Sequence, residues 1–450
     1  MLDGMPPKIT VIGLGYLGAT HAAAMAELGF EVLGLDVLPE KIDRLKRGET
    51  PIYEPGLDEL LRRHVAGLPG STGRLSFTDS PAEVAAFGDV HFVCVNTPQK
   101  PGEYACDMSY VDAAVDALAP HLSRPALVVG KSTVPVGSAA RLASRLAELA
   151  PAGEAAELAW NPEFLREGFA VEDTLRPDRI VVGVTSERAE TLLREVYATP
   201  LAAGTPFIVA DLPTAELVKT AANAFLSTKI SFINAMAEIC EAADGDVVTL
   251  AEALGHDDRI GRKFLRAGIG FGGGCLPKDI RAFMARAGEL GAAEALSFLR
   301  EIDSINMRRR AAMVELTRET LGGSLLGKRV AVLGAAFKPD SDDVRDSPAL
   351  NIAGQLHLQG AEITVYDPKG MENARQIFPT LRYAGSAAEA MRDAHAVLHL
   401  TEWREFRELD PAALGEIVAE RQILDGRNAL DPALWRKSGW TYRALGRPTA

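Results

Sequence analysis

Cysteine is scarce in this chain, and the few that occur show no metal-binding spacing. They are Cys94, Cys106, Cys240 and Cys275, in a chain of 450 residues. Zinc sites need closely spaced cysteine and histidine ligands, and small secreted domains are dense in disulfides. We therefore expect neither a metal site nor a disulfide framework, and we predict a reducing, cytoplasmic location.

Long apolar runs are also missing, because glycine, proline or charged residues interrupt every candidate. A membrane-spanning helix needs about 20 apolar residues in succession. The chain goes almost directly into Lys8–Ile12, without the basic segment, apolar core and cleavage site of a signal peptide. We predict no membrane partner.

Positive charge is in deficit, with 48 Lys and Arg against 61 Asp and Glu and a net charge of −13. Such a surface repels a phosphate polymer, so we exclude nucleic acid as a partner. An anionic ligand would have to be bound by a local group of cations. With 47% hydrophobic and 24% charged residues, the composition is that of a folded protein of two or three domains.

Short apolar runs alternate with amphipathic stretches over the first 210 residues. Leu17–Leu28 and Ser138–Leu149, for example, have helical spacing. The alternation predicts a doubly wound parallel sheet with helices on both faces. The runs expected to form its strands are Ile9–Ile12, Val32–Leu35, Val90–Val95, Ala126–Val129 and Ile180–Val182.

One long helix is predicted from Thr214 to Ala243. Asp211 supplies its start and Asp244-Gly245 its end. Its apolar face is broader than one neighbour usually covers, so we expect it between domains or at a subunit interface. Helical patterns continue to about Leu321.

Strand and helix alternate again after Gly322-Gly323-Ser324. We therefore predict two Rossmann-like domains, residues 1–210 and 323–450, joined by a central helical domain over 211–322. The strands expected in the last domain are Val330–Leu333, Ile363–Tyr366, Ala396–Leu400 and Ile423–Leu424.

Gly13, Gly15 and Gly18 follow the first predicted strand and open the first helix. Glycine there lets the chain turn tightly and admits a pyrophosphate to the helix N-terminus. Asp36 ends the next strand, 21 residues after Gly15, where an acid binds ribose hydroxyls. The same carboxylate would repel a 2′-phosphate, so we predict NAD as the cofactor in preference to NADP.

Polar residues follow three other predicted strands at the carboxyl edge, where ligands bind in such sheets. Thr97 and Thr133 offer hydroxyls, and Glu163 offers a carboxylate that could act on a water. For Thr97, ordinary turn chemistry explains the residue equally well.

Cys275 stands between three glycines, Gly272–Gly274, and Pro277, which begins a helix. We interpret the glycines as clearing side chains from around the thiol. A helix N-terminus beside Lys278 should also favour the thiolate and make it nucleophilic. We therefore predict Cys275 as a nucleophile and the other three cysteines as small buried hydrophobic residues.

Lys219 and Asn223 share one face of the long helix. An amine and an amide aimed at one point suit the stabilisation of an oxyanion, whereas a solvated patch is an equal alternative from this pair alone.

The last domain lacks the full glycine fingerprint, since Ala335-Ala-Phe-Lys338 follows its first strand. We expect a nucleotide domain altered for another ligand, in which Lys338 and the nearby Arg345 meet a phosphate and a ribose. His395 and His399 lie on one predicted strand without a third ligand, and two ordinary strand histidines explain them better than zinc.

Together these residues resemble the UDP-glucose/GDP-mannose dehydrogenase family, from about residue 8 to about residue 440. Beyond the glycine fingerprint, the long-helix pair and the cysteine loop, Asn161–Gly168 and Phe337–Pro348 carry the resemblance. Thr228–Asn234, Arg259–Gly261 and Thr401–Trp403 are similar to the branch that acts on UDP-glucose. Leu276 is a departure, because many members of that branch have an aromatic residue there and Leu is similar to the GDP-mannose branch.

The resemblance implies oxidation of the sugar C6 alcohol to a carboxylate with two NAD and one water. Cys275 would add to the intermediate aldehyde as a thiohemiacetal, and the second oxidation would leave a thioester for water to release. Asp279 and Glu163 would handle protons, and Lys219 and Asn223 would stabilise the oxyanions. The implied catalytic residues are Cys275, Lys219, Asn223, Asp279, Glu163 and Thr133, the last of which would hold a bridging water.

The resemblance also implies binding residues and a homodimer or larger oligomer formed through the central helices. Those for the cofactor are Gly13, Gly15, Tyr16, Leu17, Gly18, Asp36, Lys41, Thr97, Thr133, Glu163, Lys278 and Arg345. Those for the UDP-sugar are Glu163, Phe164, Leu165, Arg166, Glu167, Lys219, Asn223, Arg259, Phe264, Leu265, Arg266, Gly270, Phe271, Gly272, Phe337 and Lys338.

Three alternatives stay open. The first is the same chemistry on GDP-mannose or a UDP-N-acetylhexosamine. The second is a two-electron hydroxyacid dehydrogenase, which would need neither Cys275 nor a second α/β domain. The third is a non-catalytic sensor of NAD and a nucleotide sugar, which would have no use for an accessible thiol.

Overall fold

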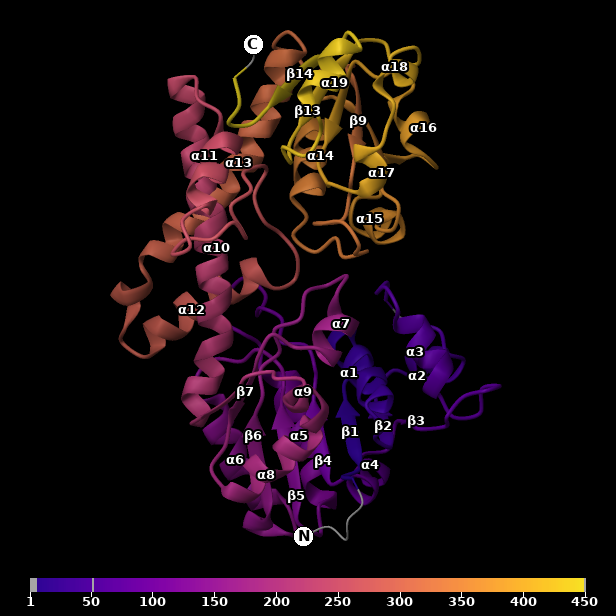
Figure 1. Cartoon of the computed structure of the whole chain (residues 1–450), viewed down its shortest axis with the longest axis vertical. Helices are drawn as coiled ribbons and strands as arrows, with labels where there is room; N and C mark the ends of the chain where they lie inside the picture. The colour runs from indigo at the N-terminus through magenta and orange to yellow at the C-terminus, as the bar shows by residue number, and fades with distance from the viewer. Residues whose placement is uncertain (1–5, 51, 449–450) are drawn as a thin grey trace. The chain divides into compact units, whose positions relative to one another are not determined.

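The computed structural model describes residues 6–50 and 52–448, and these form two compact units. The first unit runs to Ala222 and includes Arg281–Arg286, and the second takes the remaining residues. Each unit contains one twisted sheet with helices around it (Figure 1). The predicted division into three domains stays a prediction.

The sheet of the first unit has eight strands in the order β3-β2-β1-β4-β5-β6-β7-β8. Neighbours from β3 to β6 are parallel, β7 is antiparallel to β6, and β8 is parallel to β7. The strands are β1 (Ile9–Ile12), β2 (Val32–Leu35), β3 (Leu75–Thr78), β4 (Val90–Val93), β5 (Ala126–Gly130), β6 (Ala156–Trp160), β7 (Ile180–Gly183) and β8 (Phe207–Ala210).

The predicted fold class is confirmed, but the direction of the last two strands differs from the wholly parallel sheet that we expected. The connection from β6 to β7 contains α7 (Ala170–Leu175), which packs against α1 (Tyr16–Glu27). Because β7 runs opposite to β6, it starts at the carboxyl edge, where β6 ends. Two strands of this sheet, β3 and β8, were not predicted, and β6 was expected only as the strand that ends before Asn161.

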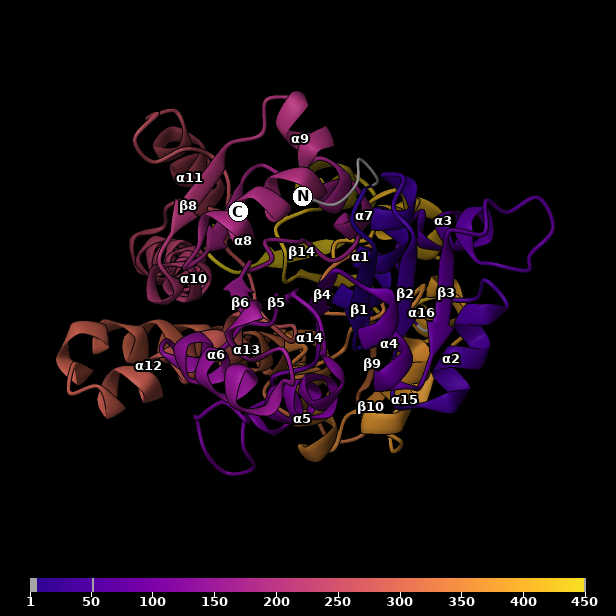
Figure 2. The ribbon, with the colours of Figure 1, turned by 90° about the horizontal axis from the view of Figure 1, so that it is seen from below.

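Helices cover both faces of this sheet (Figure 2). Apolar residues of α1, α3 and α8 pack on one face, and those of α4, α5 and α6 pack on the other. Alternate residues of one strand serve the two cores, as Val11 and Ile12 do in β1. The further helices of the unit are α2 (Pro39–Lys46), α3 (Leu57–His64), α4 (Pro81–Phe87), α5 (Ser109–Leu118), α6 (Ser138–Leu149), α8 (Glu187–Val196) and α9 (Ala198–Ala202).

The predicted long helix is confirmed as α10 (Leu212–Ala243). Asp211 Oδ1 accepts a hydrogen bond from the backbone N–H of Thr214 at 2.7 Å, which satisfies one of the free donors at the start. Asp244 then adopts a positive φ of 57°, and the Gly245 N–H donates to the carbonyl of Cys240 at 2.9 Å. The helix therefore ends at the expected Asp-Gly pair.

The sheet of the second unit has six strands, all parallel, in the order β11-β10-β9-β12-β13-β14. Apolar residues of α13 and α14 pack on one face, and those of α16, α17 and α19 pack on the other. The strands are β9 (Arg329–Leu333), β10 (Glu362–Tyr366), β11 (Arg382–Tyr383), β12 (Ala396–His399), β13 (Gln422–Asp425) and β14 (Thr441–Ala444).

The remaining helices follow α10 in the chain, and most of their residues belong to the second unit. No helix among the described residues combines the length and apolar character needed to cross a membrane. These helices are α11 (Val247–Gly255), α12 (Leu276–Glu289), α13 (Phe298–Thr320), α14 (Pro348–Leu358), α15 (Met371–Ile377), α16 (Ala387–Met391), α17 (Arg404–Arg407), α18 (Pro411–Leu414) and α19 (Pro432–Lys437); α12 also passes through the first unit.

Candidate active site

The glycine loop after β1 is packed so tightly that side chains are excluded. Gly13 has a positive φ of 89°, and a Cβ there would lie 2.8 Å from a methyl group of Val95. A Cβ on Gly18 would lie 1.8 Å from the carbonyl oxygen of Gly13. The first turn of α1 therefore approaches the end of β1 closely, as a dinucleotide site requires.

Asp36 lies directly after β2, and its carboxylate reaches the glycine loop. It accepts a hydrogen bond from the Leu14 N–H at 2.8 Å and forms an ion pair with Lys41 at 2.7 Å. Both side chains were predicted to meet the cofactor, and the structure brings them together. An acid held at this edge beside a glycine loop fits the ribose of NAD.

A buried carboxylate that the sequence reasoning missed, Glu54, fastens the start of α1 to the Asn161–Gly168 segment. The Tyr16 hydroxyl donates to Glu54, whose oxygens also accept from the N–H groups of Gly168 and Ala170, both at 2.7 Å. Burial, followed by the hydrogen bond to Glu54, raises the pKa of Tyr16 well above its ordinary value. Tyr16 thus supports the Asn161–Gly168 segment as well as the glycine loop.

Thr97 and Thr133 follow the adjacent strands β4 and β5 at the same carboxyl edge. Thr97 is buried and Thr133 is half-buried. Ser132, beside Thr133, donates its hydroxyl proton to the carbonyl of Val95 at 2.7 Å, which ties the two strand ends together.

Glu163 and Lys219, two of the predicted catalytic residues, form an ion pair at 2.8 Å within the first unit. The other Glu163 oxygen accepts from the Leu165 N–H at 2.6 Å, which fixes the carboxylate. The Lys219 ammonium also lies 5.8 Å from the ring centre of Phe164. The solvated-patch alternative for Lys219 is therefore not needed, because the amine has a specific partner.

Other residues of the Asn161–Gly168 segment contact different side chains of the first unit. Arg166 forms a bidentate ion pair with Asp173, with one contact of 3.0 Å from Nε. Arg179, from the start of β7, stacks over the ring of Phe164 at 3.9 Å. Glu167 interacts electrostatically with Tyr16.

The three glycines before Cys275 also make room for a remote segment of the second unit. A Cβ on Gly273 would lie 2.8 Å from the ring of Phe337, and one on Gly274 would lie 2.2 Å from the guanidinium of Arg345. A Cβ on Gly272 would meet the carbonyl oxygen of Asp346 at 2.3 Å. The glycines thus admit residues 337–346 to the cysteine loop, and the thiol itself is exposed.

Asp279 lies one turn after Cys275 on α12 and is held by two of the predicted site residues. Its Oδ2 accepts from the Asn223 amide at 2.6 Å, and its Oδ1 accepts from the Lys278 ammonium at 2.6 Å. Its own N–H donates to the carbonyl of Cys275 at 2.9 Å. Within the second unit, Cys275, Asp279 and Asn223 therefore form one connected group.

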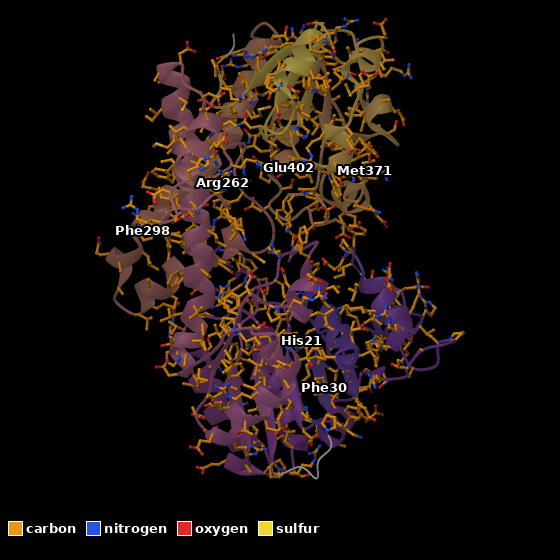
Figure 3. All side chains as sticks on the ribbon, viewed as in Figure 1. His21, Phe30, Arg262, Phe298, Met371 and Glu402 are labelled. Atoms are coloured by element: carbon orange, nitrogen blue, oxygen red, sulfur yellow. The ribbon has the colours of Figure 1, made fainter. Side chains whose placement is uncertain are left out.

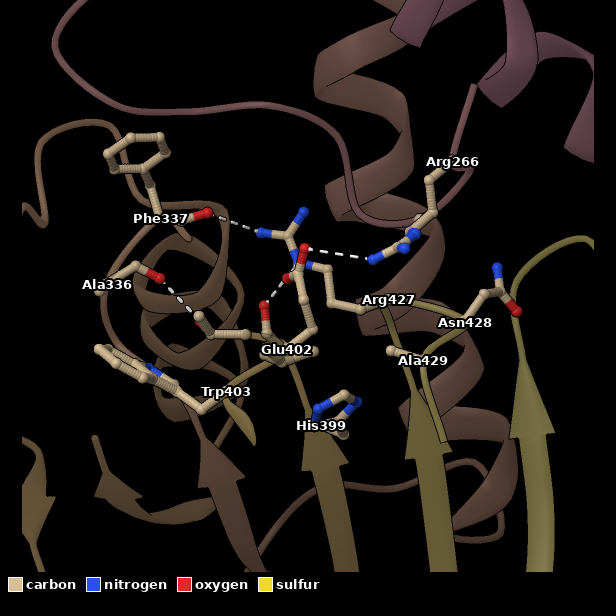
Figure 4. A network of polar contacts seen from close by, with 12 residues as sticks. Arg266, Ala336, Phe337, His399, Glu402, Trp403, Arg427, Asn428 and Ala429 are labelled. Atoms are coloured by element: carbon tan, nitrogen blue, oxygen red, sulfur yellow. Dashed lines mark hydrogen bonds and ion pairs between the residues drawn. The ribbon is translucent and has the colours of Figure 1, made fainter. Parts of the chain in front are cut away.

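Arg427, another residue that the sequence reasoning missed, holds the loop before the cysteine (Figure 4). Its guanidinium donates to the carbonyls of Leu400 at 2.8 Å, Gly270 at 3.0 Å and Phe337 at 3.1 Å. Glu402 lies 3.5 Å from Arg427 and 3.8 Å from Arg266. The half-buried cation thereby joins the end of β12 to both predicted substrate segments.

Further contacts complete this loop. The Asn306 side chain accepts from the Phe271 N–H at 2.7 Å and donates to its carbonyl at 3.0 Å. Phe264 is exposed with a positive φ of 64°, whereas Leu265 is buried. The Lys338 ammonium lies 5.5 Å from the ring centre of Phe337.

One predicted substrate residue is not brought to this loop within the described part of the chain. Arg259 pairs with Asp257, two residues earlier, at 2.6 Å and is exposed. The strand histidines also have partners of their own: His395 accepts from the Arg329 N–H at 2.9 Å, and His399 contacts Asp425 at 2.8 Å. No group of three potential metal ligands was found among the residues that the structure describes.

Sequence profiles of three domains match the chain in succession. They are the NAD binding domain of the UDP-glucose/GDP-mannose dehydrogenase family over residues 7–201, its central domain over 213–308 and its UDP binding domain over 331–432.

Similar proteins extend over the whole chain. The UDP-glucose 6-dehydrogenase of Rhizobium meliloti is 41% identical, with 98% of this chain and 100% of that protein covered. The UDP-glucose 6-dehydrogenase TuaD of Bacillus subtilis is 40% identical, with 98% and 93% covered. The structure of a UDP-glucose dehydrogenase from Pyrobaculum islandicum has a TM-score of 0.90 at 38% identity, covering 99% of both chains. A UDP-D-ManNAc dehydrogenase from Pyrococcus horikoshii has a TM-score of 0.85 at 28% identity, covering 98% of this chain and 100% of that one.

Proposed function

The chain belongs to the UDP-glucose/GDP-mannose dehydrogenase family, and from that premise we propose that it oxidises UDP-glucose at C6 to UDP-glucuronate. The reaction consumes two NAD and one water and proceeds through a thioester on Cys275. The group of Cys275, Asp279 and Asn223 in the second unit carries this proposal, because the helical turn after the cysteine places a carboxylate that is bonded to an amide four residues from the nucleophile.

The reaction consists of two oxidations and a hydrolysis. The first oxidation removes a hydride from C6 and a proton from its hydroxyl, which leaves an aldehyde. The Cys275 thiolate adds to the aldehyde carbon to form a thiohemiacetal, and loss of a second hydride and the hydroxyl proton gives the thioester. Water then forms a bond to the acyl carbon, the C–S bond breaks, and the thiolate leaves. NAD, when bound, accepts the hydride in each of the two oxidations.

Lys219 and Asn223 stabilise negative charge on the C6 oxygen. They stand one turn apart on α10, so a cation and an amide donor share one helix face. Such donors lower a barrier most where the charge develops in the transition state. The ion pair of Lys219 with Glu163 keeps the ammonium oriented before the substrate arrives.

Glu163 and Asp279 act as proton acceptors. Glu163 takes the proton of the hydrolytic water, with Thr133 holding that water. Asp279, paired with the ammonium of Lys278, accepts protons from the C6 hydroxyl or the thiol through its neighbours. These roles suit carboxylates that are already fixed by hydrogen bonds.

The nucleotide of the substrate binds at the carboxyl edge of the second sheet. The family's UDP binding domain over residues 331–432 supports this, as does Arg427, which bonds to the carbonyls of both Gly270 and Phe337. Lys338 binds a phosphate of the ligand. The names of the relatives at about 40% identity favour glucose as the sugar.

We also propose a homodimer or larger assembly in the cytoplasm. Phe225, Phe232 and Ile239 recur every seven residues on α10 and are 65%, 46% and 61% exposed. An exposed apolar stripe on a helix is typical of a surface that another chain covers. A reducing compartment keeps the Cys275 thiol available.

A turnover assay with UDP-glucose, two UDP-N-acetylhexosamines and GDP-mannose tests the proposal. We expect two NADH per UDP-glucose and the highest kcat/KM for that sugar. One NADH per sugar would favour the two-electron dehydrogenase, and tight binding without NADH formation would favour the sensor. Preference for another sugar would change the substrate and leave the chemistry intact.

A further inference from the structure

The first unit contains a cavity of about 60 Å³, and Glu163 is one of the residues that line it. It is lined by α1, by residues that follow β5 and β6, by the stretch from α7 to the first residue of β7, and by Tyr197 after α8. This volume accommodates several water molecules, since one water needs about 10–15 Å³ of such space. Its polar lining includes His21, Lys131, Asn161, Glu163 and Tyr197.

Lys131 is the unusual member of this lining. It is only 6% exposed, and its ammonium donates to the Asn161 amide oxygen at 2.9 Å and to the Asn161 carbonyl at 3.4 Å. The Tyr197 hydroxyl lies 3.4 Å from the same ammonium and donates to the Asn161 amide oxygen. Burial lowers the pKa of Lys131 to about 8. A buried cation held by neutral groups costs stability, which makes a functional role a reasonable inference.

His21 supplies an independent observation that points to water. Its side chain is 1% exposed, lines the cavity, and has no hydrogen-bond partner for Nε2 among the described residues. Figure 3 labels His21 within the first unit. A buried polar atom that faces a polar cavity is typically satisfied by ordered water.

Lys131 also connects the two strand ends that carry the hydrolytic residues. Its backbone leads through Ser132 to Thr133 at the end of β5, while its side chain holds Asn161, two residues before Glu163 at the end of β6. The Asn161 N–H donates to the carbonyl of Gly130, the residue before Lys131, at 2.8 Å. The ends of β5 and β6 are therefore joined by this backbone bond as well as by the Lys131 side chain.

We propose that the cavity binds ordered water and that Lys131 is a positioning residue which, through Asn161, fixes Glu163 and Thr133 for thioester hydrolysis. The inference rests on the proposed function. In the step concerned, water gives a proton to Glu163, its oxygen bonds to the acyl carbon, and the C–S electron pair returns to Cys275. Lys131 exchanges no proton and touches no substrate.

The test compares thioester formation with hydrolysis in a Lys131→Met variant, which keeps an unbranched side chain one atom shorter and removes its charge. Rapid mixing with UDP-glucose and NAD measures the NADH burst, and acid quenching with intact-mass analysis measures the adduct on Cys275. We expect hydrolysis to slow roughly 10- to 100-fold, while the burst changes far less and the adduct accumulates.

A second variant and a control guard against a merely structural effect. Thr174→Leu places extra volume into the cavity from α7 and should slow hydrolysis in the same selective way. Thr10→Val removes the buried 2.8 Å hydrogen bond to His91 elsewhere in the first unit. It should lower the melting temperature and leave the ratio of burst to hydrolysis unchanged.

The outcomes separate this inference from the proposed function. A wild-type enzyme that forms no Cys275 adduct and one NADH per sugar would overturn the proposed function. A wild-type enzyme that forms the adduct, with Lys131→Met and Thr174→Leu hydrolysing it at the wild-type rate, would overturn the inference alone. An equal slowing of burst and hydrolysis in both variants would also overturn it.

Discussion

Both sheets place an acid directly after the second strand of the unit, β2 in the first and β10 in the second, but the two acids have different partners. In the first sheet, Asp36 accepts from Leu14 in the loop after β1 and pairs with the side chain of Lys41. In the second sheet, Asp367 accepts from Ala335 at 2.7 Å and Ala336 at 3.0 Å in the loop after β9. Three further donors also bind Asp367: the N–H groups of Lys369 and Gly370 and the indole of Trp403.

The loops that these acids hold also differ in length. In the first sheet, α1 begins at Tyr16, directly after Gly15, and its first turn contains Gly18. In the second sheet, α14 begins only at Pro348, and the segment from Ala335 to Ser347 intervenes. That segment brings Phe337 and Arg345 against the cysteine loop.

The comparison teaches that one architecture can bind a dinucleotide or support a reactive loop. Asp36 accepts from two backbone N–H groups and pairs with a lysine side chain, whereas the oxygens of Asp367 accept from four backbone N–H groups and an indole. A carboxylate with that many fixed donors is a structural support, because moving it would leave buried N–H groups unsatisfied.

The largest effect is expected at Cys275, whose loop packs against residues 337–346 of the second unit. Cys275→Ser should lower steady-state turnover roughly a thousandfold or more, because a serine ester does not release its acyl group as a thioester does. NADH formation and mass analysis of a trapped ester on the serine measure the effect. A variant that still formed two NADH per sugar at nearly the wild-type rate would exclude Cys275 as the nucleophile.

The two acids give the next prediction. Asp36→Asn should raise the KM for NAD roughly tenfold and narrow the preference over NADP, since the charge that repels a 2′-phosphate is lost. Asp367→Asn should instead lower the free energy of unfolding by about 2 kcal/mol, because an amide NH₂ would face backbone donors.

Cofactor kinetics and urea unfolding of both variants measure these effects. If Asp367→Asn changed the NAD/NADP ratio as much as Asp36→Asn did, the distinction between a binding acid and a supporting acid would be wrong.

Lys338 tests whether the second sheet binds the phosphates. Lys338→Ala should raise the KM for the nucleotide sugar about tenfold and leave kcat nearly unchanged, because the contact is lost far from C6. Lys437→Ala, at an exposed lysine of α19 in the same unit, is the matched control. A collapsed kcat with an unchanged KM would mean that Lys338 acts at the reacting end.

The smallest effect concerns a histidine buried in the first sheet. Burial lowers the pKa of His91 to about 3, and its partner is the neutral hydroxyl of Thr10 at 2.8 Å. Below about pH 6.5, His91 is protonated in the unfolded chain and stays neutral in the folded chain. The free energy of unfolding therefore falls as the pH decreases. At pH 5.5 the loss should reach about 1.4 kcal/mol relative to neutral pH.

His91→Asn should remove this part of the pH dependence, and urea unfolding at pH 7.5 and 5.5 measures it. His121→Gln, at an exposed histidine, should leave the pH dependence of the free energy of unfolding unchanged. Identical pH dependence in His91→Asn and the wild type would show that His91 is already protonated in the folded chain.

Local patterns were sufficient for most of the fold and for the chemistry-bearing residues. The bounds of β1 and β2 match the predicted runs, and α10 starts and ends within two residues of prediction. Apolar periodicity, glycine turns and caps act between neighbours, so they can be read along the chain. The same reasoning predicted roles for Asp36 and Cys275, which stand beside motifs that are contiguous in sequence, and for Lys219, which shares a helix face with Asn223; these roles stay predictions.

Tertiary structure alone decided which distant segments these residues meet. Glu54 holds Gly168 across 114 residues, and Arg427 holds Gly270 across 157. The direction of β7 and the packing of Gly273 against Phe337 were decided in the same way. A buried polar group must find partners wherever the folded chain supplies them, and no local pattern encodes that position. The sequence by itself thus determined the elements and the reactive groups, and the packing of remote segments determined how those groups are held.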